Sequence, residues 1–278
     1  SRNAPIVIAF NAQKKIKFLS VVDERRAGFF ALGIAQQTGS PVALICTSGS
    51  AVLNYAPAIV EAYHQKIPLL ILTADRPTEW VDQDDGQTLR QSFIYSNYIK
   101  ASYTLPADSS HADDLWYAQR IASEAYNTAV EKGNESPVHI NIPLREPLYV
   151  ESANMDKAVR EINVADVKRT LSHESEKEII GEWKNAKKKM IICGLHKPDN
   201  EVNYLLSAIA KDSSVAIITE ATSNMFDEKF ICNVDGYFES LTEAQKKSLQ
   251  PDLLITCGGP VTTKKFKAYL RKYKPAQH

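Results

Sequence analysis

The sequence predicts an α/β fold with two doubly wound, mainly parallel three-layer α/β/α domains, and three observations support this prediction. Short apolar runs typical of buried parallel strands recur along the chain, for example at residues 41–46 and 68–73. Between these runs lie segments whose apolar residues repeat every three to four positions, as in amphipathic helices. A polar stretch without a clear period, residues 151–175, divides this alternation into two parts, as expected for an interdomain linker.

The first domain is expected at residues 1–150. A strand ending at Val21-Val22 should precede a helix that starts at Asp23 and stops at Thr38-Gly39. The elements expected after it are, in order, a strand at 41–46, a helix at 51–63, a strand at 68–73, a long polar stretch at 75–97, a helix at 112–132 and a strand at 138–142. Strand–helix–strand alternation at this spacing predicts that the strands are parallel.

The second domain is expected at residues 176–278. Ser175 and Glu178 have the spacing of a capping box, which predicts that the first helix of this domain opens at Ser175. Further elements are expected as strands at 190–193, 215–219 and 252–257, a helix headed by Pro198 and a basic helix at 264–274. A closing strand is expected after Pro275 and is missing, so this domain should be incomplete. The opening at Ser1, without Met, reads as the middle of a loop, so the first domain should lack its start.

The composition argues against several classes of protein. Lys and Arg together number 33, as do Asp and Glu, so the formal net charge is zero and nothing global attracts nucleic acid or an anionic membrane. No apolar run reaches the roughly 20 residues of a membrane-spanning helix, and no signal peptide is visible. The four cysteines form no C-x-x-C pair and are expected to be buried free thiols. These features indicate a protein of the reducing cytoplasm.

Polar residues follow each of the first three expected strands, at the end where parallel α/β sheets bind ligands. Glu24 opens a helix, residues 47–50 form a hydroxyl-rich turn, and Arg76 follows the third strand. Each also has a purely structural explanation. Glu24 could be a first-turn acid that favours the helix dipole, the turn could cap a helix, and Arg76 could pair with a surface acid. The pattern alone leaves both explanations open.

Several strings carry a resemblance to one family. They are S-R-N-A-P at 1–5, D-E-R-R-A-G-F-F-A-L-G at 23–33, T-S-G-S-A-V at 47–52, L-T-A-D-R-P at 72–77, H-I-N-I-P at 139–143 and E-P-L at 146–148. Their order and spacing resemble the 2-succinyl-5-enolpyruvyl-6-hydroxy-3-cyclohexene-1-carboxylate (SEPHCHC) synthases, thiamine diphosphate-dependent enzymes of menaquinone biosynthesis. The resemblance covers their N-terminal and central domains. Beyond residue 151 it lies in the fold, with one local match at 262–265.

This resemblance implies thiamine diphosphate as the cofactor and assigns Glu24 the catalytic role. In the family, a glutamate hydrogen-bonded to the aminopyrimidine ring favours the imino tautomer, whose nitrogen removes the thiazolium proton. The Glu24 carboxyl is therefore expected to be buried, with a raised pKa, and Phe29 and Phe30 could supply its apolar surroundings. Ser48 and Gly49 match the turn that contacts the cofactor.

The resemblance also implies the reaction: decarboxylation of 2-oxoglutarate and conjugate addition of the succinyl carbanion equivalent to isochorismate. The residues that match substrate-site positions are Ser1, Arg2, Arg76, Gln87, Lys264 and Lys265. An arginine can bind a carboxylate through two parallel hydrogen bonds, which suits polycarboxylate substrates. Two stretches depart from the family pattern: Asp84-Asp85-Gly86 before Gln87, and T-T-K-K at 262–265 in place of T-G-K-R. Lys264 and Lys265 could equally belong to a solvated basic helix.

Family members carry a third domain, which holds the diphosphate and Mg²⁺ through a G-D-x…N segment. No such segment occurs here, so this chain should supply no metal ligands and should be inactive alone. The family's cofactor lies between subunits, which implies a homodimer or homotetramer.

Two alternatives stay open. One is another thiamine diphosphate enzyme, such as an acetolactate synthase or a 2-oxo acid decarboxylase. The other is a non-catalytic module that binds a carboxylated metabolite.

Overall fold

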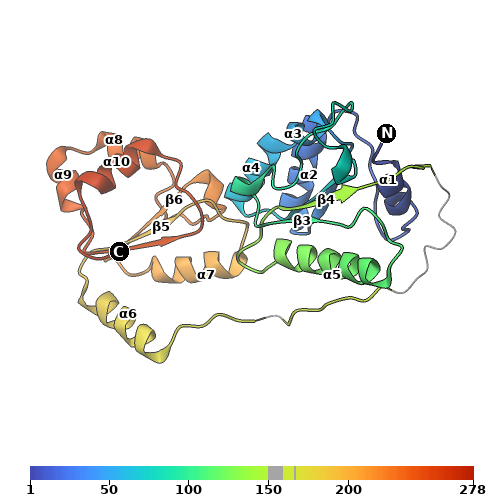
Figure 1. Ribbon diagram of the computed structural model, residues 1–278. Helices are drawn as coiled ribbons and strands as arrows, with labels where there is room; N and C mark the ends of the chain where they lie inside the picture. The colour runs from blue at the N-terminus through green and yellow to red at the C-terminus, as the bar shows by residue number, and fades with distance from the viewer. Residues whose placement is uncertain (150–158, 166) are drawn as a thin grey trace. The chain divides into compact units, whose positions relative to one another are not determined.

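The computed structural model describes residues 1–149, 159–165 and 167–278, which form two compact units, residues 1–167 and 168–278 (Figure 1). Each unit contains one parallel sheet with helices on both faces, which confirms the predicted α/β class. The division falls inside the predicted linker at 151–175, of which residues 151–158 and 166 lie outside the described residues. In the described part of the chain, no helix has the length and apolar character needed to cross a lipid bilayer.

The sheet of the first unit has four strands in the order β1-β2-β4-β3, and every neighbouring pair is parallel. The strands are β1 Val42–Cys46, β2 Leu69–Asp75, β3 Ala101–Thr104 and β4 Val138–Pro143. β1, β2 and β4 match the predicted apolar runs, because strands covered on both faces are apolar throughout. β3 was not predicted. It is short and half-buried, so it has no apolar run to reveal it.

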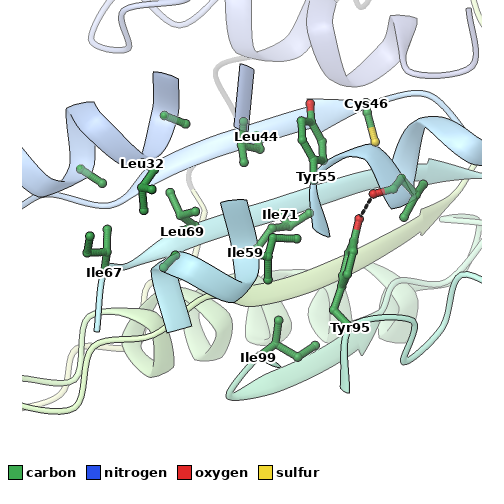
Figure 2. Packing of buried hydrophobic residues seen from close by; sticks show 14 residues of the cluster. Leu32, Leu44, Cys46, Tyr55, Ile59, Ile67, Leu69, Ile71, Tyr95 and Ile99 are labelled. Carbon is green, nitrogen blue, oxygen red and sulfur yellow. Dashed lines mark hydrogen bonds between the residues drawn. The ribbon is translucent and has the colours of Figure 1, made fainter. Parts of the chain in front are cut away.

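Helices cover both faces of this sheet. On one face α2 (Glu24–Thr38), α3 (Ser50–Asn54) and α4 (Ala56–Gln65) pack on the strands, and Tyr55 and Tyr95 lie fully buried among aliphatic side chains (Figure 2). On the other face are α1 (Ala4–Asn11) and α5 (Ala112–Ala129). A single helix was predicted at 51–63. It is divided at Tyr55, because Pro57 has no N–H to donate to the carbonyl four residues earlier.

The predicted strand ending at Val21-Val22 is wrong. The chain has no regular structure there, and Val22 is fully exposed. Residues 15–21 lie across an apolar groove of about 520 Å³ from β1, so their backbone has no neighbouring strand to pair with. Asp23 nevertheless starts α2 as predicted, because its side chain accepts hydrogen bonds from the N–H groups of Arg25 and Arg26.

The second unit has a parallel sheet in the order β6-β5-β7. Its elements are α6 His173–Asn185, β5 Lys189–Cys193, α7 Asn200–Ile209, β6 Val215–Thr219, α8 Val234–Ser240, α9 Glu243–Ser248, β7 Leu253–Cys257 and α10 Lys264–Lys272. α6 and α7 pack on one face of the sheet, and α8 and α10 on the other. After Pro275, Gln277 pairs with Leu253 in parallel, at the position where a closing strand was expected.

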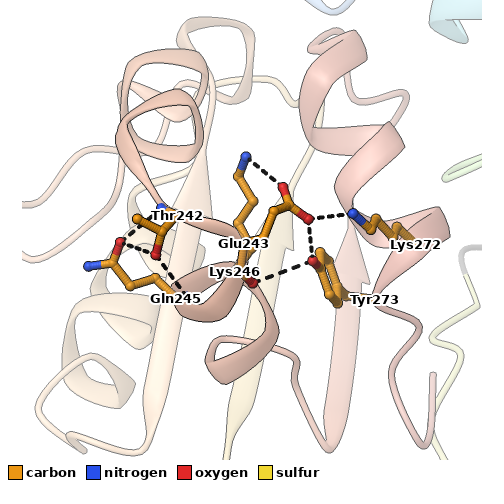
Figure 3. A network of polar contacts seen from close by, with 6 residues as sticks. All are labelled: Thr242, Glu243, Gln245, Lys246, Lys272 and Tyr273. Carbon is orange, nitrogen blue, oxygen red and sulfur yellow. Dashed lines mark hydrogen bonds and ion pairs between the residues drawn. The ribbon is translucent and has the colours of Figure 1, made fainter.

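The predicted start of this unit needs a correction. Ser172, not Ser175, caps α6: its backbone is extended, and its side chain accepts a hydrogen bond from the N–H of Ser175. The helix therefore begins at His173, inside the stretch assigned to the linker. A true capping box occurs at Thr242 and Gln245 of α9 (Figure 3).

A polar network joins α9 to α10 (Figure 3). Glu243 pairs with Lys272, with Lys246 at 3.4 Å, and accepts a hydrogen bond of 2.7 Å from the Tyr273 hydroxyl. The hydrogen bond from Lys272 lowers the pKa of Glu243 to about 2. The basic residues near the end of α10 are therefore partly neutralised within the unit.

Candidate functional site

Glu24 lies in the first turn of α2, next to the carboxyl end of β1. Within the described residues its carboxylate makes no hydrogen bond or ion pair. Burial raises the pKa of Cys46 to about 12, and the Glu24 charge contributes to this rise; the same charge acts on the buried Tyr55. Glu24 is therefore near enough to the end of β1 for its charge to act on Cys46, and its oxygens are available to a ligand.

The expected apolar shield around Glu24 is wrong for this chain. The Glu24 side chain is partly exposed, and Phe29 and Phe30 are 50% and 53% exposed. The cause is helical periodicity: the buried stripe of α2 runs through Gly28, Ala31, Leu32 and Ala35, which leaves both phenylalanines outside it.

The turn after β1 brings Ser48, Gly49 and Gln87 together. Ser48 is 2% exposed, and its carbonyl accepts a hydrogen bond of 3.1 Å from Gln87 Nε2. Gly49 has φ +82°, and a Cβ atom there would lie 2.7 Å from Gln87 Cγ and 3.1 Å from the Gln87 carbonyl oxygen. Gln87 itself has a left-handed backbone, with φ 62°. The turn is thus held against the loop that follows β2, and only glycine fits at position 49.

The side chain of Gln91 connects the turn after β1 to β2 and β4, and the sequence analysis did not predict this role. Its side chain is 1% exposed and accepts a hydrogen bond of 2.9 Å from Gly49 N–H. It donates to the Ala74 carbonyl at 3.1 Å and to Asn141 Oδ1 at 3.0 Å. Asn141 in turn donates to Asp75 Oδ2 at 2.8 Å. One buried network therefore connects the carboxyl ends of β1, β2 and β4.

One sequence feature could have predicted this network: polar residues lie inside the otherwise apolar strands. Thr73 and Asp75 interrupt β2, and His139 and Asn141 interrupt β4. Thr73 Oγ1 lies 2.7 Å from His139 Nε2 and donates to Asn141 Oδ1 at 3.0 Å. Burial raises the pKa of Asp75. Buried polar groups need such partners, so a polar residue in a buried strand predicts a network.

Three arginines from separate segments line a cavity of about 440 Å³, together with Trp80 and Asp85. Arg2 is 8% exposed and donates to the Leu144 carbonyl at 2.7 Å. The Arg76 N–H donates to Asp75 Oδ1 at 2.8 Å, and its guanidinium pairs with Asp85 at 2.9 Å. The structure thus brings the predicted Arg2 and Arg76 together.

The third arginine of this cavity, Arg145, was missed, because an arginine beyond a strand is indistinguishable by pattern from a solvated surface residue. It pairs with Glu79 and, at 3.0 Å, with Asp108. Ser1 is exposed, and its backbone nitrogen contacts the Tyr149 hydroxyl; Ser1 does not line the cavity.

Lys264 and Lys265 belong to the second unit, at the start of α10. The preceding loop is held by Glu220, whose carboxylate accepts hydrogen bonds from Thr262 N–H (2.7 Å), Thr262 Oγ1 (2.8 Å) and Thr263 N–H (2.8 Å). Lys265 pairs with Glu239 at 2.8 Å, while Lys264 makes no hydrogen bond or ion pair within the described residues. Lys264 is therefore the lysine available to an external anion.

Among residues 1–149, 159–165 and 167–278, no three His, Cys, Asp or Glu side chains are grouped so that they could hold a metal ion.

The chain is similar in sequence to known proteins along its whole length. Residues 1–94 match the family model of the thiamine pyrophosphate enzyme N-terminal TPP-binding domain. SEPHCHC synthases from Flavobacterium johnsoniae and Desulfotalea psychrophila are each 41% identical to the chain over 280 aligned residues, and that from Christiangramia forsetii is 40% identical over 294. Each alignment covers 100% of this chain and 49%, 52% and 51% of the relative, respectively. The chain is a relative of the SEPHCHC synthases.

This relationship extends over both units. The chain spans about half the length of the SEPHCHC synthases it matches. The residues 1–94 that match the family model contain Glu24, the 47–50 turn, Arg76 and Gln91, whereas Asn141 and Arg145 lie beyond the match.

Proposed function

We propose that this protein is a SEPHCHC synthase of menaquinone biosynthesis that acts in the cytoplasm. In this proposal it decarboxylates 2-oxoglutarate and adds the succinyl unit to isochorismate, with thiamine diphosphate as cofactor. The observation that carries the proposal is Glu24, a carboxylate without a partner within the described residues, beside the end of β1 in a domain of the thiamine pyrophosphate-binding family. The relationship to the SEPHCHC synthases supports the choice of substrates.

The residues of the first unit fit the aminopyrimidine end of the cofactor. The free oxygens of Glu24 can accept a hydrogen bond from a ring N–H, whereas the space on the Cβ side of Gly49 is filled by Gln87. When bound, thiamine diphosphate supplies the electron sink for decarboxylation of a 2-oxo acid. The part of Glu24 is to hold the ring and to set the position of its proton.

The arginine cavity fits the substrates. Its lining contains three basic residues, Arg2, Arg76 and Arg145, and two acidic residues, Asp85 and Glu146. Both proposed substrates carry more than one carboxylate, and guanidinium groups bind carboxylates through paired hydrogen bonds. Asp85 holds Arg76 until a stronger carboxylate ligand replaces it. Lys264, in the second unit, is proposed separately as a residue that binds a substrate carboxylate.

Diphosphate and Mg²⁺ are proposed to be held by a segment outside this chain, in an assembly of two or four subunits. The residues 1–278 alone are proposed to lack synthase activity. Measurable turnover of 2-oxoglutarate with isochorismate by this stretch alone would overturn that part of the proposal.

The test of the main proposal is Glu24→Gln in the intact protein. Loss of the carboxylate should lower kcat at least about 100-fold, a typical contribution of a positioned proton-transfer group, while the unfolding temperature stays unchanged. Glu174→Gln, at an exposed first-turn acid of α6, is the matched control and should retain activity. Unchanged turnover in Glu24→Gln would remove Glu24 from the mechanism.

A substrate comparison separates the alternatives. The intact protein should consume 2-oxoglutarate only with isochorismate present as acceptor, and should leave pyruvate untouched. Turnover of pyruvate would instead identify an acetolactate synthase or decarboxylase. Binding of 2-oxoglutarate without turnover under any condition would identify a non-catalytic binding module.

A further inference from the structure

The second unit places two cysteines side by side at the ends of neighbouring strands. Cys193 ends β5, Cys257 ends β7, and the two are register partners in the parallel pair. Their Sγ atoms lie 3.4 Å apart. Neighbouring strands are about 4.8 Å apart, and a disulfide spans Cα separations of about 4.4–6.8 Å, so these strands need no rearrangement to accept one. We propose that Cys193 and Cys257 form a reversible dithiol–disulfide site that low-molecular-weight disulfides oxidise.

The two sulfurs have different surroundings, which gives each a different role. Cys193 is 2% exposed, whereas Cys257 is partly exposed. The hydrogen bond with Cys193 lowers the pKa of Cys257 to about 7, and the charge of His196 acts in the same direction. The same contact, together with burial, raises the pKa of Cys193. Since the thiolate is the reactive form, Cys257 is the attacking sulfur and Cys193 the resolving one.

The oxidation is a two-step exchange. The Cys257 thiolate attacks one sulfur of an oxidised glutathione molecule, forms a mixed disulfide and releases one glutathione thiolate. Cys193 then loses its proton to solvent and attacks the Cys257 sulfur, which forms the intramolecular disulfide and releases the second glutathione thiolate. Two protein thiols are oxidised and one glutathione disulfide is reduced, so the electrons balance.

The backbone around the pair is packed too tightly for the strands to move apart. The Gly194 N–H donates to the Cys257 carbonyl at 2.9 Å. A Cβ atom on Gly194 would lie 2.1 Å from the Gly259 oxygen, and one on Gly258 would lie 2.9 Å from the Leu195 oxygen. Bond formation therefore has to come from rotation of the two side chains.

The other two cysteines serve as internal controls. Cys46 is buried in the first unit, and Cys232 is exposed, which corrects the expectation that all four thiols are buried. The Cys232 sulfur lies 3.3 Å from Thr219 Oγ1 and 3.7 Å from the Phe230 carbonyl oxygen, and neither partner is a thiol. Cys232 can form a mixed disulfide but has no resolving thiol beside it.

The experiment oxidises the intact protein with oxidised glutathione, blocks remaining thiols with iodoacetamide and maps tryptic peptides without reduction. Cleavage after Lys189 and Lys247 places Cys193 and Cys257 on separate peptides. The expected result is one linked peptide pair that carries both cysteines, lacks two hydrogens and separates with dithiothreitol. Cys232→Ser should leave this pair unchanged.

Variants of the pair make the proposal falsifiable at each step. Cys193→Ala should trap glutathione on Cys257, and Cys257→Ser should leave Cys193 without any adduct. The rate of Cys257 alkylation should reach half its maximum near pH 7 in the parent protein, and at higher pH in Cys193→Ala. Glutathione found on Cys232 only, with Cys193 and Cys257 both alkylated by iodoacetamide after unfolding, would overturn the proposal.

Discussion

The backbone N–H of Gly49 donates a hydrogen bond of 2.9 Å to the buried side chain of Gln91, 42 positions further along the chain. This contact fixes the turn after β1 against the loop after β2. The turn contains Ser48, and the loop leads from Arg76, so the bond sets the spacing between the proposed cofactor and substrate residues.

Gly49→Ala should destabilise the protein by about 1–3 kcal/mol, because alanine is strained in this glycine-specific conformation. Its Cβ would also meet the Gln87 carbonyl oxygen at 3.1 Å. Urea unfolding of the intact protein measures the loss. Gly33→Ala is the control: it lies inside α2 with open space around it and should gain up to about 1 kcal/mol from helix propensity. Equal effects at both positions would contradict this account of Gly49.

Gln91→Ala should cost about 2–4 kcal/mol, because it leaves the Gly49 N–H without its acceptor and creates a cavity. The change should also weaken substrate binding, since Gln91 holds the Ala74 carbonyl directly before Asp75 and Arg76. The unfolding free energy and the KM for 2-oxoglutarate are the two measurements. Gln36→Ala, at an exposed position of α2, should change stability by less than about 0.5 kcal/mol. A Gln91 variant as stable as the Gln36 variant would show that the network carries little energy.

The sequence predicted the parts of this molecule that local patterns encode. The strand at 215–219 coincides with β6, and the apolar runs at 41–46 and 68–73 contain or overlap β1 and β2. Continuous apolar runs are unambiguous when helices cover both faces of a sheet. The run at Val21-Val22 failed because a strand also needs a neighbour to pair with, and no local pattern records whether one is present.

In the candidate site, too, local patterns predict some residues, whereas others come together only through the pairing of distant segments. Glu24, Gly49 and Arg76 stand at strand ends, where a pattern can find them. Gln91 and Asn141 are 50 positions apart in sequence, and their contact exists only after β2 and β4 pair. The assignment of Glu24 stays a prediction that Glu24→Gln tests, and the assignments of the substrate residues stay predictions.

Glu220→Gln should destabilise the second unit by about 1–3 kcal/mol at neutral pH. Burial opposes ionisation of Glu220, but the hydrogen bonds from Thr262 and Thr263 outweigh it and lower its pKa. A lowered carboxyl pKa contributes stability above its unfolded value of about 4.3, and this contribution is lost as the pH falls through the folded value. The difference between parent and variant should therefore shrink below about pH 4. Glu228→Gln, at an exposed neighbouring acid, is the control, and a difference independent of pH would contradict the prediction.

His139 should make the first unit sensitive to acid. Its ring is buried, lies 2.7 Å from Thr73 Oγ1 and packs edge-on against Tyr95, and burial lowers its pKa from 6.5 to about 4. The unfolded chain therefore binds a proton between these two values, while the folded chain does not. The contribution of His139 to the free energy of unfolding is therefore fully present above about pH 6.5. It falls by about 3 kcal/mol as the pH decreases to about 4.

The measurement is the unfolding free energy of His139→Gln and of the parent protein from about pH 7 to pH 4. The parent should lose more stability over this range, because glutamine does not titrate, and the two curves should converge toward acid. His173→Gln, at an exposed position of α6, should follow the parent curve. Parallel curves for His139→Gln and the parent would mean that His139 has the same pKa in the folded and the unfolded chain, which would contradict the prediction.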